Sequence, residues 1–260
     1  MLVTFDSLPE FIQCVRTKVE RPLQKHSRDA WYGYVSFDEA IEKTLHGDSR
    51  YVQEAMTLID QLDLAMPETK MFRTIASPYG GRCNFGDWQT GSPTPMRRRV
   101  RATTDYGPLK VIVATTCSQG ITANTMRQRG AAILALLLKL QELRPVELYL
   151  LAEMFGCTEG WHYQLIRVES KPLDTSIAGF VLANVGFARH LTYELGRVLD
   201  NFNGSWPSDY RQSDYASRRR ERLNLQDDDI VIPEVYITDT LVTQPIKWIT
   251  ERLAQYGVKE

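Results

Sequence analysis

The amino-acid sequence predicts an α/β protein with a mainly parallel, doubly wound sheet that follows a helical N-terminal region. A buried strand, "LKVIVATT", leads directly into a long helical pattern at 122–143, and strands and helices then alternate to the C-terminus. Residues before 70 carry helical periodicity, and the stretch between is rich in Gly, Pro, Ser and Thr. We therefore expect three parts: 1–70 helical, 71–108 irregular, and 109–260 α/β.

The first part contains signals for three helices. Ser7 and Ser36 are suited to cap the first two, because each is followed three residues later by a glutamate, the pattern of a capping box. Gly47 is placed to end the second helix, and a third is expected from about 49 to 63.

The last part predicts a sheet with covering helices. The expected strands are 109–116, 146–155, 161–170 and 229–239, and the expected helices are 122–143, 176–199 and 244–257. The stretch Ala131 to Leu138 is apolar nearly all round its helix, so it is either core or an oligomer contact. The small Gly130 just before it indicates close packing of a neighbouring element.

Composition excludes several classes of protein. The chain has 260 residues, 43% hydrophobic and 24% charged, so a buried core is expected and global disorder is not. Its net charge of −1 gives no overall attraction to nucleic acid or to anionic membranes. Because no apolar run reaches bilayer length and the N-terminus lacks a basic leader, we expect a cytoplasmic protein without membrane contact. The four cysteines show no C-x-x-C spacing and are expected to be reduced, buried thiols.

Catalytic signals are few. None of the four histidines stands at metal-ligand spacing, and His190, inside a helical pattern, is expected to be packed. Cys117 and Ser118 follow the first predicted strand and are candidate nucleophiles, but no G-x-S-x-G elbow surrounds them and no base can be assigned. We therefore expect a non-enzymatic protein with no cofactor and no metal, and keep a Cys/Ser hydrolase as the third alternative.

The element order after 109 resembles a von Willebrand factor A-type domain, whose metal site follows the first strand as Asp-x-Ser-x-Ser. Here the matching positions read Thr116-Cys117-Ser118-Gln119-Gly120, so Ser118 alone agrees and the aspartate is missing. Asp239, after the last strand, falls where that family often has an acid. The resemblance implies a Rossmann-like fold without metal, whose edge at Ser118 and Asp239 contacts a protein partner or another copy of the chain.

Four segments resemble a group of proteins from tailed phages. They are "FDSLPEF", "WYGYVSFDEAI", "GSPTPMRRR" and "RGAAILALLLKLQELRPVEL". The resemblance implies the cytoplasm of an infected bacterium as the setting. It carries no activity and no catalytic residue.

One feature points to a partner: basic and aromatic residues that occur together. The arginines are Arg82, Arg97, Arg98, Arg99 and Arg101, and the flat side chains best placed to stack are Trp31 and Trp88. Arginines that pair with phosphates beside aromatic platforms are how proteins hold single strands. We expect an accessory protein that binds nucleic acid, single-stranded DNA foremost, or a nucleic-acid-handling machine. The alternatives are a solvated arginine loop and the protein-interaction module described above.

Overall fold

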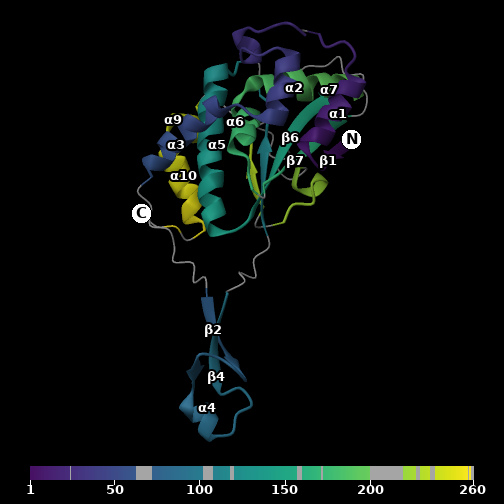
Figure 1. Ribbon diagram of the computed structural model, residues 1–260. Helices are drawn as coiled ribbons and strands as arrows, with labels where there is room; N and C mark the ends of the chain where they lie inside the picture. The colour runs from purple at the N-terminus through teal and green to yellow at the C-terminus, as the bar shows by residue number, and fades with distance from the viewer. Residues whose placement is uncertain are drawn as a thin grey trace. The chain divides into compact units, whose positions relative to one another are not determined.

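The computed structural model describes residues 1–23, 25–62, 72–101, 108–117, 120–156, 160–170, 172–199, 219–226, 229–234, 238–256 and 258 (Figure 1). These form two compact units. The main unit combines the N-terminal helices with the residues after 107, and the second unit contains residues 72–101. The helical N-terminal region and the α/β part therefore share one unit, because the N-terminal strand and helices pack on the sheet and its helices.

The main unit is built on a five-stranded sheet in the order β1-β7-β6-β5-β8. The strands are β1 (Leu2–Phe5), β5 (Leu109–Ala114), β6 (Val146–Gly156), β7 (Gly160–Val168) and β8 (Ile230–Ile232). β5 runs parallel to β6 and β8, and β1 runs parallel to β7, whereas β6 and β7 are antiparallel. The α/β class with a mostly parallel sheet is thus confirmed. The edge strand β1 was not predicted.

The first two helices of the main unit begin at the caps that the sequence predicts, and the other helices follow along the chain. They are α1 (Leu8–Lys18), α2 (Phe37–His46), α3 (Val52–Asp60), α5 (Ala123–Leu143), α6 (Thr175–Ala183), α7 (Tyr193–Leu199), α9 (Thr240–Thr243) and α10 (Pro245–Ala254). Ser7 caps α1, and Ser36 caps α2 in a complete capping box with Glu39. Because each cap satisfies a first-turn N–H that has no partner within the helix, it fixes where the helix begins.

The helix expected at 176–199 is interrupted. α6 ends at Asn184, which has extended backbone angles (φ −98°, ψ 122°), and a π-helical segment, η3 (Phe187–Thr192), precedes α7. The Asn184 amide donates to the Gly33 carbonyl and the Tyr51 hydroxyl and accepts from the Gly186 N–H. These bonds stabilise the break, and two of them come from the N-terminal region, so the local pattern did not reveal it.

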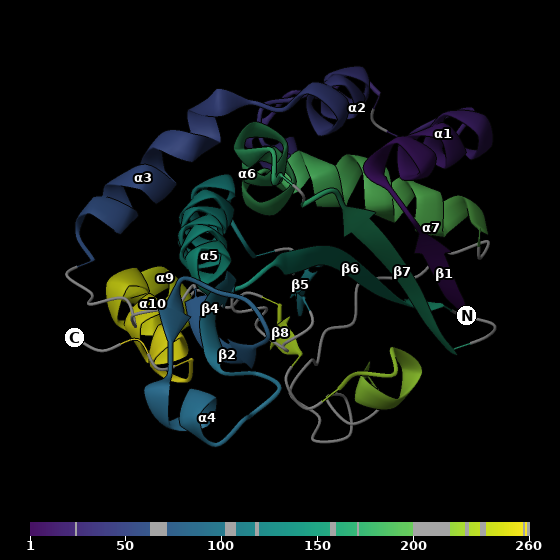
Figure 2. The ribbon, with the colours of Figure 1, turned by 60° about the horizontal axis from the view of Figure 1, so that its bottom comes forward.

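Both faces of the sheet are covered. Successive side chains of a strand point to opposite faces, and on β7 the amide of Gln164 bonds to the Thr192 carbonyl, whereas Leu165 packs in a cluster with Leu223. One face therefore lies under η3 and its neighbouring helices, and the other under residues 219–226, as Figure 2 shows.

The long helix α5 is buried within the chain itself. Its residues from Ala131 to Leu137 are all buried, so the core interpretation of this stretch is confirmed. A Cβ on Gly130 would lie 2.4 Å from Cα of Ala183, so this glycine lets α6 cross close to α5, as its position indicated. None of the helices in the described part of the chain combines the length and apolarity needed to cross a membrane.

Candidate nucleic-acid interface

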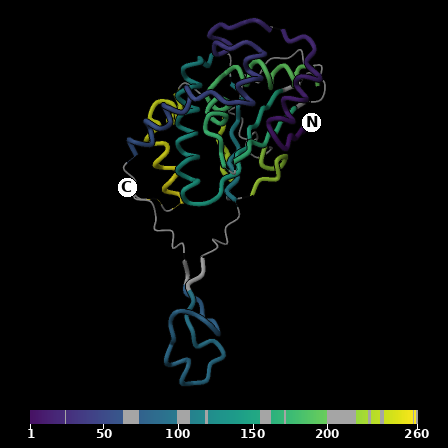
Figure 3. The backbone as a smooth tube through the Cα atoms, viewed as in Figure 1, coloured from purple at the N-terminus to yellow at the C-terminus, as the bar shows by residue number. Residues whose placement is uncertain are grey.

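The second unit, which we call the arginine–aromatic unit, comprises residues 72–101. Its elements are β2 (Phe72–Ser77), β3 (Arg82–Cys83), α4 (Phe85–Gln89) and β4 (Met96–Arg101). The strands form an antiparallel sheet in the order β2-β4-β3, and Figure 3 traces the backbone through it. A Cβ on Gly80 would lie 2.5 Å from the Arg97 carbonyl oxygen, so the turn after β2 requires a glycine. Within the segment expected to be irregular, with loops and short strands, residues 72–101 thus form three short strands and one short helix joined by turns.

This unit has almost no core of its own. Between residues 74 and 98, Ser77 is the one residue that is buried. Three large aromatic side chains are exposed instead, with exposed fractions of 64% for Tyr79, 72% for Phe85 and 62% for Trp88. Exposed apolar groups that form a contiguous patch mark an interaction site, so these side chains are candidates for contact with a ligand.

The unit is strongly basic although the chain is nearly neutral. Residues 72–101 contain six arginines and one acid, Asp87, for a net charge of +5. Because the whole chain has a net charge of −1, the remaining residues carry −6. Because the positive charge is concentrated in this unit, the unit attracts polyanions although the net charge of the whole chain is −1.

Two of the predicted arginines lie directly opposite each other. Arg82 on β3 pairs in register with Arg97 on β4. Like charges in this position destabilise a sheet. Asp87 on α4 compensates in part, since its carboxylate lies 2.6 Å from Nη2 of Arg97. Arg82 is exposed and has no carboxylate partner among the described residues. The pairing of Arg82 with Arg97 therefore costs the sheet local stability that Asp87 restores in part.

Arg98 is held against an aromatic ring. Its Cζ lies 5.4 Å from the ring centroid of Tyr79, and its Nη1 donates to the Tyr79 hydroxyl at 3.1 Å. Both side chains are exposed, so the pair presents a cation and a flat face together.

α4 carries the other two aromatic side chains. Phe85 and Trp88 are three residues apart, so they are neighbours on one side of this short helix. Asn84 caps α4 and also donates to Asp87 at 2.8 Å, and Asp87 joins α4 to Arg97 on β4. The helix with the aromatic rings is thereby fastened to the strand with the arginines.

For three of the predicted binding residues, the structure does not show a side chain on the arginine–aromatic unit. Arg99 and Arg101 belong to β4, opposite Thr74 and Phe72, but their side chains lie outside the described part of the structure. Trp31 lies in the main unit, where the Arg189 guanidinium stacks on its ring at 3.6 Å and donates to its carbonyl at 2.7 Å. This contact covers one face of the indole, and Trp31 belongs to the main unit, so the proposal for the arginine–aromatic unit does not use it.

The proposed interaction edge is described in part. Ser118 lies outside the described residues. Asp239 is half-buried at the N-cap of α9, where its carbonyl accepts the Val242 and Thr243 N–H groups and its side chain does not cap the helix. In the described ranges, no three His, Cys, Asp or Glu side chains gather as a metal site would require.

A buried ionic cluster near this edge was missed by the sequence reasoning. Arg219 donates to both carboxylate oxygens of Glu153, at 3.0 and 2.6 Å, and to Glu234. Burial and a hydrogen bond with Glu234 raise the pKa of Glu153 to about 8, although Arg219 opposes the shift. The one available signal was Glu153, which stands between apolar residues in the second half of β6.

A second buried charge lies close by. Arg129 on α5 is fully buried and donates through Nη2 to the carbonyls of Ala114 and Pro233, at 2.8 Å each. These bonds connect α5 to the carboxyl ends of β5 and β8. Burial lowers the pKa of Arg129 to about 10.

Two residues weighed as catalytic are buried. Cys117 is 1% exposed, and burial raises the pKa of its thiol, the opposite of what a nucleophile needs. His190 is buried, stacks on Tyr32 at 4.1 Å and bonds through Nε2 to the Val35 carbonyl. Its packed role is confirmed. Cys14, Cys83 and Cys117 are free thiols, as expected, but Cys117 alone of these three is buried, whereas Cys14 is half-buried and Cys83 is exposed. Cys157 lies outside the described residues.

Comparison with known proteins gives a family but no activity. No curated protein matches the chain, and no solved structure matches it. The family that matches is described as "Domain of unknown function (DUF7192)", and the match covers residues 1–260. Since it spans both units, the arginine–aromatic unit lies within the family's own extent. The chain belongs to the DUF7192 family.

Proposed function

We propose that the protein binds nucleic acid through the arginine–aromatic unit and prefers single strands. The observation that carries this proposal is the exposure of Tyr79, Phe85 and Trp88 on a 30-residue unit with a net charge of +5. Exposed rings in a basic setting suit a ligand that offers both flat bases and phosphates.

The two kinds of side chain have separate tasks. Arg82, Arg97 and Arg98 pair with phosphates, which gives an affinity that depends on salt and little on sequence. The rings of Trp88 and Phe85 stack on bases, at about 1–3 kcal/mol per stacked base. In a duplex the base faces are already stacked, so the aromatic contribution is available only to a single strand.

A competition experiment tests this preference. A labelled single-stranded oligonucleotide is bound to the full chain and displaced with unlabelled single strand or with duplex of equal phosphate content. The proposal expects the single strand to compete at a concentration about tenfold lower, as one stacked base contributes roughly 1.4 kcal/mol or more. If single strand and duplex compete equally, the aromatic rings do not stack on bases. If neither ligand binds, the proposed function is wrong.

The second candidate is a metal-free interaction module of the von Willebrand factor A type. The parallel pairing of β5 with β6 and β8, with α5 directly after β5, supports it. Its contact edge would include Asp239, at the start of α9. Under this candidate Asp239→Arg abolishes capture of a protein partner or self-association while oligonucleotide affinity stays unchanged. If a partner is still captured by the variant, this edge is not the contact. The phage setting remains a prediction from the resemblance.

A further inference from the structure

The main unit contains a cavity of about 470 Å³ that the proposed function does not use. It lies between four segments: residues 30–34, η2 (Ser49–Tyr51), the first turn of α5 and the end of α6. Its volume falls within the usual range for small-molecule sites.

The charge of the lining is one-sided. Arg50 and Arg127 line the cavity, and none of its lining residues is acidic. Each arginine has a carboxylate neighbour outside the lining: Arg50 contacts Asp48 and Arg127 contacts Glu54, with closest distances of 2.6 and 3.0 Å. Both guanidinium groups remain substantially exposed, with exposed fractions of 69% and 50% for the side chains. The Arg127–Glu54 pair is exposed on both sides and contributes little to stability, so the Arg127 guanidinium remains available to another anion. Asp48 is only 8% exposed and accepts from Nε and Nη2 of Arg50, so Arg50 reaches another anion by leaving part of this contact to Lys43.

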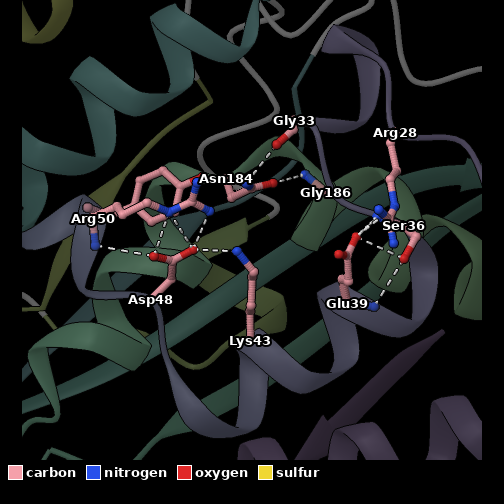
Figure 4. Close-up of polar contacts among 10 residues, drawn as sticks. Arg28, Gly33, Ser36, Glu39, Lys43, Asp48, Arg50, Asn184 and Gly186 are labelled. Carbon is pink, nitrogen blue, oxygen red and sulfur yellow. Dashed lines mark hydrogen bonds and ion pairs between the residues drawn. The ribbon is translucent and has the colours of Figure 1, made fainter.

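Asp48 has a second cationic partner besides Arg50. Its carboxylate also lies 2.5 Å from Nζ of Lys43, and Figure 4 shows Asp48 between these two cations. When Arg50 turns toward a ligand, Lys43 still neutralises Asp48. Hydrogen bonds from Arg50 and Lys43 hold the pKa of Asp48 well below its usual range, so the carboxylate stays ionised beside the cavity.

Tyr51, which follows Arg50 in η2, presents a hydroxyl donor to the cavity. The buried Asn184 donates to the Tyr51 hydroxyl oxygen at 2.5 Å and is itself held by Gly33 and Gly186 (Figure 4). Because the oxygen accepts from Asn184, the hydroxyl hydrogen is directed to another acceptor. Burial raises the pKa of Tyr51, so this hydrogen is retained at neutral pH.

We propose that this cavity binds a small molecule that carries a phosphate group. Arg50 and Arg127 hold the phosphate oxygens with charge-assisted hydrogen bonds, and the Tyr51 hydroxyl donates a further one. The exposed ring of Tyr34, which also lines the cavity, contacts the rest of the ligand. The site is separate from the arginine–aromatic unit and does not rest on its function.

Calorimetric titration of the full chain tests the proposal with three probes: adenosine monophosphate, ribose 5-phosphate and inorganic phosphate. Adenosine and ribose are the matched controls without phosphate. We expect a phosphorylated probe to bind about tenfold or more tightly than its control, because hydrogen bonds to charged groups are strong. If adenosine monophosphate alone binds tightly, the ligand is a nucleotide. If both phosphate esters bind tightly, the ligand is a sugar phosphate. If all three probes bind equally, the ligand is free phosphate.

Variants assign the binding to the cavity. Arg127→Gln and Arg50→Gln should each weaken binding about fivefold or more, and Arg50→Lys should restore part of the loss because the charge remains. Arg252→Gln, on α10 and away from the lining, is the control and should leave affinity unchanged. Arg98→Gln should also leave it unchanged, which separates this site from the nucleic-acid interface. If no phosphorylated probe binds more tightly than its control, or if binding survives loss of both Arg50 and Arg127, the proposal is wrong.

Discussion

The Arg98 guanidinium lies over the ring of Tyr79, 5.4 Å from its centroid, and donates to the hydroxyl of the same side chain. This relationship arranges two exposed side chains before any ligand arrives. A guanidinium that is held in place loses less conformational freedom when it binds a phosphate, so preorganisation favours affinity. The pair is therefore the most specific support for a binding role of the arginine–aromatic unit.

Arg98→Gln should weaken binding of single-stranded DNA and reduce its salt dependence. Removal of one phosphate contact lowers the slope of log affinity against log salt by about 0.7 for a single strand. Fluorescence anisotropy at several salt concentrations measures both quantities. Arg252→Gln is the matched control, since Arg252 also lies over an aromatic ring, that of Trp248, but in the main unit. Equal losses in the two variants would contradict the assignment to Arg98.

Trp88→Ala should weaken binding without destabilising the protein. The side chain is 62% exposed, so its loss removes little packing, but a stacked base contributes about 1–3 kcal/mol, or roughly 5- to 150-fold in affinity. Trp88→Phe should keep part of the affinity because a smaller ring remains. Anisotropy gives the affinities, and thermal unfolding checks stability. An unchanged affinity for the alanine variant would exclude Trp88 as a stacking platform.

Asp87→Asn should strengthen binding. Asp87 is the sole acid in the sequence of residues 72–101, and its carboxylate lies 2.6 Å from the Arg97 guanidinium. Its neutralisation releases Arg97 for phosphate and raises the charge of the unit by one, so the salt slope should steepen by about 0.7. The same titrations test this outcome. Weaker binding, with the unit still folded by circular dichroism, would show that the Asp87–Arg97 pair positions the site instead of competing with phosphate.

Glu153→Gln should remove part of the pH dependence of stability. The pKa of Glu153 is raised from 4.5 to about 8, so the folded chain retains a proton that the unfolded chain releases above pH 4.5. The contribution of Glu153 to the free energy of unfolding is fully present below about pH 4.5. It is lost as the pH rises toward 8, by up to about 1.4 kcal/mol per pH unit. Glutamine cannot ionise, so the variant should lose less stability over this window. Urea unfolding at pH 5, 6.5 and 8 measures the difference, and parallel pH profiles of the two proteins would contradict it.

Sequence patterns predicted what is decided locally. The caps at Ser7 and Ser36 depend on residues within one turn, and the class of the sheet depends on alternating strands and helices. The break at Asn184 escaped prediction because its hydrogen-bond partners Gly33 and Tyr51 lie more than a hundred residues away in the sequence.

The candidate site was predicted in its chemistry but only partly in its geometry. Arg82, Arg97, Arg98 and Trp88 belong to one unit, as expected from their proximity in the sequence. Trp31 was grouped with them by residue type, whereas its ring packs on Arg189 in the main unit. The cavity between Arg50 and Arg127 could not be predicted, since its lining comes from four separate segments.

The salt dependence of single-strand binding by the full chain tests the central claim most directly. If about four of the six arginines in residues 72–101 contact phosphates, log affinity should fall with log salt at a slope near −3. Affinity measured by anisotropy should then drop by roughly 50-fold between about 50 and 200 mM salt. A fall of less than about threefold, which corresponds to fewer than two phosphate contacts, would contradict the account. These arginines would then be solvated side chains that do not bind phosphate.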